Sequence, residues 1–443
     1  MRVLKTAIDR EEIRLLLARR PFPAETEEEI RRTVEDILSR VRQEGDKALV
    51  DYTKAFDGVD LTTAGIRVKE EELQAARGKV APEFLAALHT AKENILRYHR
   101  QQVSRSWTIY EEEGIVLGQR YLPLDTVGLY VPGGTGGKTP LVSSVLMNAL
   151  PAVVAGVSRI IMCTPPTQNG TVEPHILAAA LEAGVTEVYK LGGAQAVAAM
   201  AFGTGTVPRV DKIVGPGNNY VTMAKRLVYG EVGLDFLAGP SEIIIVADET
   251  ASPRLVAADL LSQAEHGPVD EAAATLLTPS ASLLAETARE VERQLQALSR
   301  KEIARASLEK NGGLILTRDL AEAVDLANFA APEHLELMVA EPYYWLTKIR
   351  HAGAIFLGSF TPESVGDYVA GTNHVLPTGG TARFASALSV DDFVKKSSFV
   401  AYSSEGLEKF GPAAVALARV EGLEAHARAV EIRLEDIEGR GKN

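Results

Sequence analysis

Histidine and carboxylate side chains gather in the last two-fifths of the sequence. Of the 8 histidines in the 443 residues, five lie there: His266, His334, His351, His374 and His426. Most of these have an Asp or Glu beside them or within a helical turn or loop. Imidazole titrates near neutral pH and suits acid–base chemistry, while nitrogen and oxygen donors without thiolate suit zinc, manganese or cobalt. The pattern indicates a metal site, although spacing alone leaves open which residues bind the metal.

Gln263-Ala264-Glu265-His266 ends a helix expected over residues 253–266, which Ser252 and Pro253 can start. Gln263 continues the apolar stripe of this helix, so its amide needs a partner in the interior. His266 is its neighbour on the helix surface. A histidine near the negative end of a helix dipole is also a common structural arrangement, and this segment by itself favours that interpretation.

Three further segments bring polar groups together in loops or turns. Glu333 and His334 are adjacent in a turn before an expected strand, which suits general acid–base catalysis. Such a pair is, however, often exposed on the surface without a function. Residues 365–378 contain Asp367 and His374 in a loop whose density of hydrogen-bonding side chains is hard to explain by packing alone. Residues 421–426, taken alone, are typical of a solvated helix face.

Glycine-rich turns follow several expected strands. The loop after residue 131 resembles a phosphate-binding loop, but Pro132 occupies the position of the first glycine of a Walker A motif, so an NTPase is disfavoured. The turns at 191–195 and 214–218 each close a strand and open a helix, where doubly wound sheets bind ligands. Neither turn has the G-x-G-x-x-G dinucleotide pattern, so this signal is weak alone.

The elements that must position these residues follow two patterns. Residues 11–105 have apolar positions every three or four residues among many charges, which predicts amphipathic helices. Beyond residue 124, short β-rich runs alternate with helical stretches; strands are expected at 127–131, 159–163, 187–191, 210–214, 242–247, 274–277, 314–317, 335–339 and 354–357. This alternation predicts an α/β fold of two doubly wound, Rossmann-like parallel-sheet domains with small helical N- and C-terminal domains.

Composition limits the partners and the compartment. Lys and Arg number 47 against 59 Asp and Glu, and the net charge of −12 disfavours nucleic acid and anionic membranes. Cys163 is the only cysteine, which excludes an intrachain disulfide and a thiolate zinc cage and fits a reducing cytoplasm. The N-terminus lacks the continuous apolar stretch of a signal peptide, and the uncharged stretches at 139–158 and 191–208 are not apolar enough to predict membrane spans.

Taken together, the motifs resemble histidinol dehydrogenase, a zinc- and NAD-dependent enzyme family of histidine biosynthesis. The match spans about residues 122–434 in family order and rests on eight motifs: GLYVPGG (128–134), GAQA (193–196), GPGN (215–218), AGPSE (238–242), QAEH (263–266), PEH (332–334), TNHVLPT (372–378) and EGLEAH (421–426). The resemblance implies oxidation of L-histidinol to L-histidine via L-histidinal, the last two steps of the pathway, with NAD and one zinc per subunit.

The resemblance also implies a role for each matched residue. His334 would be the general base, and Glu333 would activate water. The implied NAD contacts are Tyr130, Gln195 and Asn218. The implied metal ligands are Gln263, His266, Asp367 and His426. The implied substrate contacts are these four ligands together with Ser241, His334, His374 and Glu421.

The family builds its active site across a homodimer, so Glu421 and His426 are expected to act in the partner chain's site. We predict a helical arm at 1–29, a large α/β domain at 30–129 and 241–383, an NAD-binding α/β domain at 130–240, and an exchanged helical tail at 384–443. Two alternatives stay open: a scaffold relative that oxidises another polar alcohol, and a metal-dependent hydrolase with Glu333 or Glu265 as base.

Overall fold

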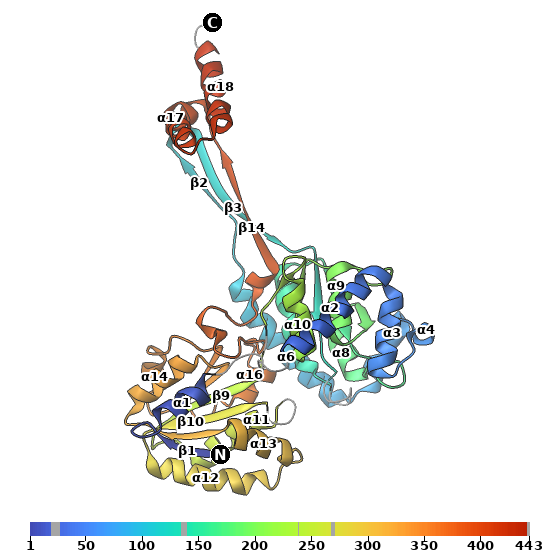
Figure 1. The fold of residues 1–443 in the computed structure, drawn as a ribbon, viewed down its shortest axis with the longest axis vertical. Helices are drawn as coiled ribbons and strands as arrows, with labels where there is room; N and C mark the ends of the chain where they lie inside the picture. The colour runs from blue at the N-terminus through green and yellow to red at the C-terminus, as the bar shows by residue number, and fades with distance from the viewer. Residues whose placement is uncertain (19–26, 134–139, 238, 267–270, 441–443) are drawn as a thin grey trace. The chain divides into compact units, whose positions relative to one another are not determined.

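A computed structural model describes residues 1–18, 27–133, 140–237, 239–266 and 271–440. The chain forms two units, one of residues 1–102 and 124–393 and the other of residues 103–123 and 394–443 (Figure 1). No helix in these described ranges is long and apolar enough to cross a membrane.

The first sheet of the larger unit has five parallel strands in the order β6-β5-β4-β7-β8. The strands are β4 (Thr126–Tyr130), β5 (Arg159–Thr164), β6 (Glu187–Lys190), β7 (Lys212–Val214) and β8 (Gly233–Leu234). The helices that follow them are α7 (Val142–Ala155), α8 (Pro174–Glu182), α9 (Gly193–Phe202) and α10 (Asn219–Val228). The strand order reverses between β4 and β7, which makes that point the switch point of a doubly wound sheet.

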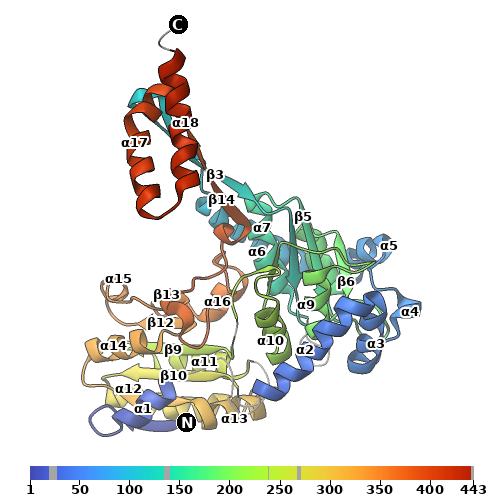
Figure 2. The same cartoon turned by 45° about the horizontal axis from the view of Figure 1, so that its top comes forward.

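The N-terminal helices pack on this sheet's layer. They are α2 (Glu27–Glu44), α3 (Asp46–Asp57), α4 (Leu61–Ala64), α5 (Glu70–Gln74) and α6 (Pro82–His99). The predicted stripe of α2 is buried and joins one hydrophobic core with α9 and α10. Figure 2 shows α2 running beside α9 and α10. The charges of α2 lie on its other face, as a helix covering a core requires.

The second sheet of the larger unit has six parallel strands in the order β1-β11-β10-β9-β12-β13. The strands are β1 (Arg2–Lys5), β9 (Glu242–Ala247), β10 (Ala273–Thr278), β11 (Gly313–Leu316), β12 (His334–Met338) and β13 (Ala354–Leu357). Its helices are α1 (Arg10–Leu17), α11 (Pro253–Ala264), α12 (Ala281–Leu295), α13 (Lys301–Asn311), α14 (Leu320–Ala330), α15 (Pro342–Leu346) and α16 (Glu363–Tyr368). All six residues of β9 are buried, because helices cover both faces of the sheet.

The smaller unit combines an antiparallel sheet with two helices. The sheet has the order β14-β3-β2, from β2 (Trp107–Glu111), β3 (Ile115–Pro123) and β14 (Val394–Ala401). The helices are α17 (Ser404–Val420) and α18 (Glu424–Arg440), which pack against each other.

The predicted fold class is confirmed, and all nine predicted strands are present within a few residues of their expected ends. Five strands were not predicted: β1, β8 and the three of the antiparallel sheet. Every residue of β2 and most of β14 are exposed, so these strands lack the alternation that a buried face imposes. The domain boundaries at 1–29, 30–129, 130–240, 241–383 and 384–443 are finer than the two units and stay a prediction; β14 lies inside the range expected to be helical.

Candidate active site

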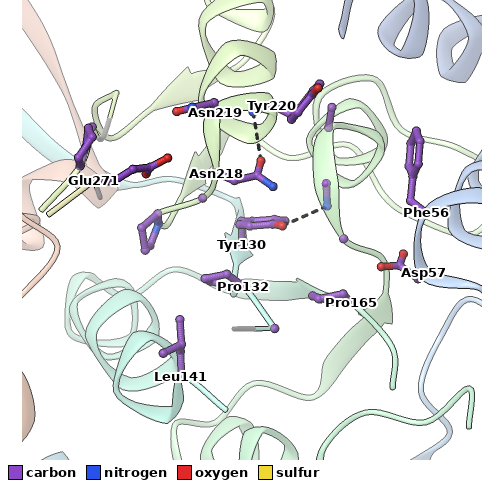
Figure 3. A pocket seen from close by; sticks show the side chains of 18 of the residues that line it. Phe56, Asp57, Tyr130, Pro132, Leu141, Pro165, Asn218, Asn219, Tyr220 and Glu271 are labelled. Carbon is purple, nitrogen blue, oxygen red and sulfur yellow. Dashed lines mark hydrogen bonds between the residues drawn. The ribbon is translucent and has the colours of Figure 1, made fainter. Parts of the chain in front are cut away.

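The carboxyl ends of β4 and β7 open onto a cavity of about 930 Å³. Tyr130 ends β4. Asn218 caps α10, because its side-chain oxygen accepts hydrogen bonds from the backbone N–H groups of Tyr220 and Val221, at 3.1 Å each. Gln195, in the first turn of α9, also lines the cavity, and its buried Oε1 has no hydrogen-bond partner among the described residues. The three predicted cofactor contacts therefore line one space at the switch point, and Figure 3 shows Tyr130 and Asn218 there.

Backbone geometry brings the two turns close to Tyr130. The Tyr130 hydroxyl accepts a hydrogen bond from the Gly193 N–H at 3.1 Å, and burial raises the pKa of Tyr130 to about 12. Gly215 has φ +116°, and a Cβ there would lie 2.1 Å from the Tyr130 carbonyl oxygen. Only glycine fits this approach, which explains why the turn after β7 contains one.

A buried ion pair holds the turn after β7, and it was not predicted. Lys225 of α10 and Asp235 have side chains that are only 3% and 1% exposed, and they are hydrogen-bonded to each other. The Lys225 ammonium donates to the Gly215 carbonyl oxygen at 3.0 Å, and Asp235 Oδ2 accepts from the Gly215 N–H at 2.8 Å. Nothing in the sequence distinguishes Lys225 from a solvated lysine.

The predicted catalytic residues lie at the amino end of β12, and the predicted substrate contact Ser241 lies at the amino end of the neighbouring strand β9. Ser241 directly precedes β9, Glu333 directly precedes β12, and His334 is the first residue of β12. The Glu333 carboxylate accepts hydrogen bonds from the Ser241 hydroxyl at 2.5 Å and from the Glu242 N–H at 2.9 Å. Ser241 also lines the cavity, so Glu333 lies directly behind one wall of it.

His334 is held in one orientation and is 3% exposed. Its Nδ1 lies 3.1 Å from the Glu242 carbonyl oxygen and 3.1 Å from Gln263 Oε1. Both are acceptors, so the neutral ring carries its proton on Nδ1 and presents the lone pair of Nε2. Nε2 has no hydrogen-bond partner within the described ranges. Burial lowers the pKa of His334, against an opposing effect of the Asp367 charge, so the ring is neutral at pH 7.

A group of metal-binding character adjoins His334. His266, Glu363 and Asp367 each offer a ligand atom, and these atoms lie within 4.8 Å of one another. Gln263 is fully buried one helical turn before His266, and its Nε2 has no partner in the described part of the chain. His374 Nδ1 lies 3.9 Å from an Asp367 carboxylate oxygen. Burial lowers the pKa of both histidines, which keeps them available as ligands.

Glu363 was not predicted as part of this group. It is 1% exposed, one carboxylate oxygen lies 3.9 Å from His334 Nε2, and burial raises its pKa well above the usual value. Glu363 and Asp367 are four residues apart on α16, so their side chains share one helix face. That spacing is the signal that could have found Glu363.

Glu421 and His426 belong to the smaller unit. Glu421 follows the last residue of α17, His426 lies in the first turn of α18, and both are exposed. All other predicted site residues lie in the larger unit. The glycine-rich loop at 134–139 and the residues after His266 at 267–270 lie outside the described residues.

The family model of histidinol dehydrogenase matches residues 21–434. The chain belongs to the histidinol dehydrogenase family. The histidinol dehydrogenase of Geobacillus kaustophilus is 55% identical over 417 residues, which cover 94% of this chain and 96% of that protein. The histidinol dehydrogenase of Syntrophotalea carbinolica is 52% identical over 421 residues, 95% of this chain and 96% of that protein. The crystal structure of histidinol dehydrogenase from Elizabethkingia anophelis matches with a TM-score of 0.92 and 40% identity over 99% of each chain.

The predicted family resemblance is thereby confirmed, and with it the prediction of an oxidoreductase of histidine biosynthesis acting on a small molecule. Membership of this family also sets aside the metal-dependent hydrolase and the NTPase. The family model and the crystal structure of histidinol dehydrogenase both match the smaller unit as well as the parallel sheets, so the similarity extends beyond the α/β fold.

Proposed function

We propose that this protein oxidises L-histidinol to L-histidine via L-histidinal with NAD, and that one site performs both oxidations. The observation that carries this proposal is His334: a buried neutral imidazole, fixed through Nδ1, whose Nε2 lone pair is unpartnered within the described residues and adjoins the metal-type group. Its neighbour Glu333 contacts the cavity wall at Ser241. A base and a carboxylate side by side are what successive alcohol and aldehyde oxidations require.

NAD fits the cavity at the switch point. Gln195 and Asn218 line this space, the buried Oε1 of Gln195 has no partner among the described residues, and the volume is large enough for a dinucleotide. Tyr130, Gln195 and Asn218 would contact it. When bound, NAD supplies the hydride acceptor for each oxidation.

Zinc fits the group beside His334, because its donors are imidazole nitrogen and carboxylate or amide oxygen. Gln263, His266 and Asp367 would hold it together with His426 from a second copy of the chain, and Glu363 lies beside them. When bound, one zinc per subunit supplies a positively charged template that orients the amino and imidazole nitrogens of the substrate.

The chain's own residues carry the proton transfers. His334 Nε2 accepts the hydroxyl proton of the alcohol as the first hydride leaves. Glu333 then accepts a proton from water that attacks the aldehyde, and the Ser241 and Glu242 donors fix its carboxylate in place. His334 Nε2 accepts the hydroxyl proton of the resulting hydrate as the second hydride leaves. Ser241, His374 and Glu421 would contact the substrate, together with the metal ligands.

A homodimer with shared active sites is part of this proposal. Four large apolar side chains of α17, α18 and the turn between them are exposed: Leu417, Val420, Leu423 and Ile432. The neighbouring Glu421 and His426 are also exposed. A second copy of the chain would cover such a patch and receive these polar groups. A cytoplasmic location also stays a prediction, in keeping with the free thiol of Cys163.

The test is turnover of zinc-loaded protein with L-histidinol and NAD, measured as NADH formation. The proposal expects activity with L-histidinol, loss on chelation, recovery with zinc, and far slower reaction of amino alcohols without an imidazole. A comparable rate with such an alcohol would instead support the scaffold relative that acts on another polar alcohol.

A further inference from the structure

A buried carboxyl group on the same strand as His334 has no part in the proposed proton transfers. Glu336 is two residues after His334 on β12, so the two side chains point to the same face of the sheet. Glu336 is 1% exposed, and a glutamate is almost never buried to this extent unless it is paired. Its partners therefore indicate what it does there.

One partner is the start of α16. Glu336 Oε1 accepts a hydrogen bond at 2.9 Å from the N–H of Glu363, the first residue of that helix. Pro362, which precedes the helix, has no side-chain oxygen that could cap it. α16 has only 6 residues, and a helix of that length needs support from outside. Glu336 gives that support from a neighbouring strand.

The other partner is Asp259 of α11. The two carboxyl groups lie within hydrogen-bond reach of each other, and no N–H or O–H donor of the described residues reaches Glu336 Oε2. Burial and the Asp259 charge raise the pKa of Glu336 well above its usual value, and burial raises the pKa of Asp259 to about 6. Glu336 therefore keeps its proton at neutral pH and donates it in a hydrogen bond to the Asp259 carboxylate.

This pair repeats the arrangement around His334. Asp259 and Gln263 are four residues apart on α11, so they share one face of that helix. His334 contacts Gln263 and lies 3.9 Å from a Glu363 carboxylate oxygen. Glu336 contacts Asp259 and the Glu363 N–H. Two side chains of β12 thus each link α11 to α16, the helices whose positions can be followed in Figure 2.

We propose that Glu336 is a positioning residue of the metal group, because its hydrogen bonds to Asp259 and to the Glu363 N–H fix the spacing between α11 and α16. That spacing sets where Asp367 of α16 lies relative to the ligands at the end of α11. The inference rests on the proposed zinc and adds a residue that holds its site without touching metal or substrate. Hydrogen bonds behind metal ligands commonly contribute about 10–100-fold to metal affinity.

The test is the zinc affinity of the purified protein, measured by competition with a chromophoric chelator, beside its stability in urea. Glu336→Met keeps the length of the side chain and removes both hydrogen bonds, so zinc is expected to bind about 10–100-fold more weakly. Glu336→Gln is expected to bind zinc as the parent does. Its amide oxygen can accept from the Glu363 N–H, and its amide N–H can donate to Asp259.

Two further variants separate positioning from stability. Glu336→Met combined with Asp259→Leu also removes the unpaired carboxylate, so stability is expected to recover while zinc affinity stays low. Asp248 is a buried carboxylate just after β9, at the other end of the strand, and it accepts from the N–H groups of Thr250 and Ala340. Asp248→Ala is expected to lower stability and to leave zinc affinity unchanged.

Parent-like zinc affinity in Glu336→Met would overturn the inference. Zinc affinity that recovers with stability in the double variant, or that falls in Asp248→Ala, would overturn it too, because affinity would then only follow stability. An equal loss in Glu336→Gln and Glu336→Met would show that the hydrogen bonds are not the cause. Failure of the parent protein to bind zinc would instead overturn the zinc site of the proposed function.

Discussion

Apart from β1 at the edge of the six-stranded sheet, the two parallel sheets of the larger unit have the same strand order, but their candidate site residues lie at opposite ends of the strands. In β6-β5-β4-β7-β8 these residues follow the strands: Tyr130 ends β4, and Asn218 lies beyond β7. In the other sheet, β9 takes the place of β4 and β12 that of β7, yet Ser241 and Glu333 precede their strands. The rule that ligands bind at carboxyl ends locates the first set and would miss the second.

At the amino ends of the strands, both a strand and the helix that returns from it supply polar groups for a site. The first N–H groups of a strand are available to bind an acceptor, and Glu333 uses the one at Glu242. The helix after β9 runs back towards the amino ends of the strands, so its last turn brings Gln263 there, and His266 follows just past the helix end. Cofactor residues at helix starts and His266, just past a helix end, can therefore line one cavity.

Removing the base at the amino end of β12 has the largest expected effect on turnover. His334→Gln is expected to lower turnover of both L-histidinol and L-histidinal by about 10²–10⁴-fold, the usual share of a general base. NADH affinity, measured by fluorescence, is expected to stay unchanged. A parallel loss of NADH affinity would contradict the division of labour between the two edges.

Glu333→Gln distinguishes the aldehyde oxidation from the alcohol oxidation. We expect aldehyde oxidation to fall about 10²-fold, because water activation loses its base, and alcohol oxidation to fall much less. The two steps are measured separately with L-histidinol and L-histidinal. Equal losses in both steps would remove the role assigned to Glu333.

Lys225→Met tests the buried ion pair that holds the turn at the carboxyl end of β7. The substitution leaves Asp235 as a buried unpaired charge, so we expect a loss of about 3–5 kcal/mol in the free energy of unfolding, measured with urea. The double variant Lys225→Met with Asp235→Leu is the control, and it is expected to recover part of this loss. Equal stability of parent and Lys225→Met would mean that the pair does not hold the Gly215 turn.

Asn218→Ala has a smaller expected effect on stability. It removes the cap of α10, which is worth about 1 kcal/mol, and Asn218→Asp is expected to keep that stability because a carboxylate also caps. Both variants are expected to weaken NADH binding, since the amide is the proposed contact. Full NADH affinity in Asn218→Ala would limit Asn218 to a capping role.

Cys163 of β5 gives the smallest expected effect. It is fully buried, and burial raises the pKa of its thiol, so it is neither exposed nor ionised at neutral pH. A thiol reagent is expected to leave native turnover unchanged and to react only after denaturation. Rapid labelling of the native protein would contradict its place in the core.

The parallel sheets could be predicted because burial on both faces leaves apolar runs such as residues 242–247, with turns at their ends. The antiparallel sheet could not, because β2 and β14 are exposed and carry no such pattern. The motifs around Glu333 and Gln263 were recognised from the family, but no local pattern indicates that the amino ends of β9 and β12 bring them together. Lys225 was missed because nothing in its local sequence shows that its side chain is buried, whereas Glu363 could have been found from its four-residue spacing to Asp367.

We propose that the residues at the carboxyl ends of one sheet and at the amino ends of the other form one site that carries out both oxidations. The most direct measurement is the amount of NADH formed per L-histidinol consumed by the zinc-loaded protein, with free L-histidinal assayed in the same mixture. We expect about two NADH per L-histidinol and no accumulation of aldehyde. About one NADH per L-histidinol with release of the aldehyde would contradict it.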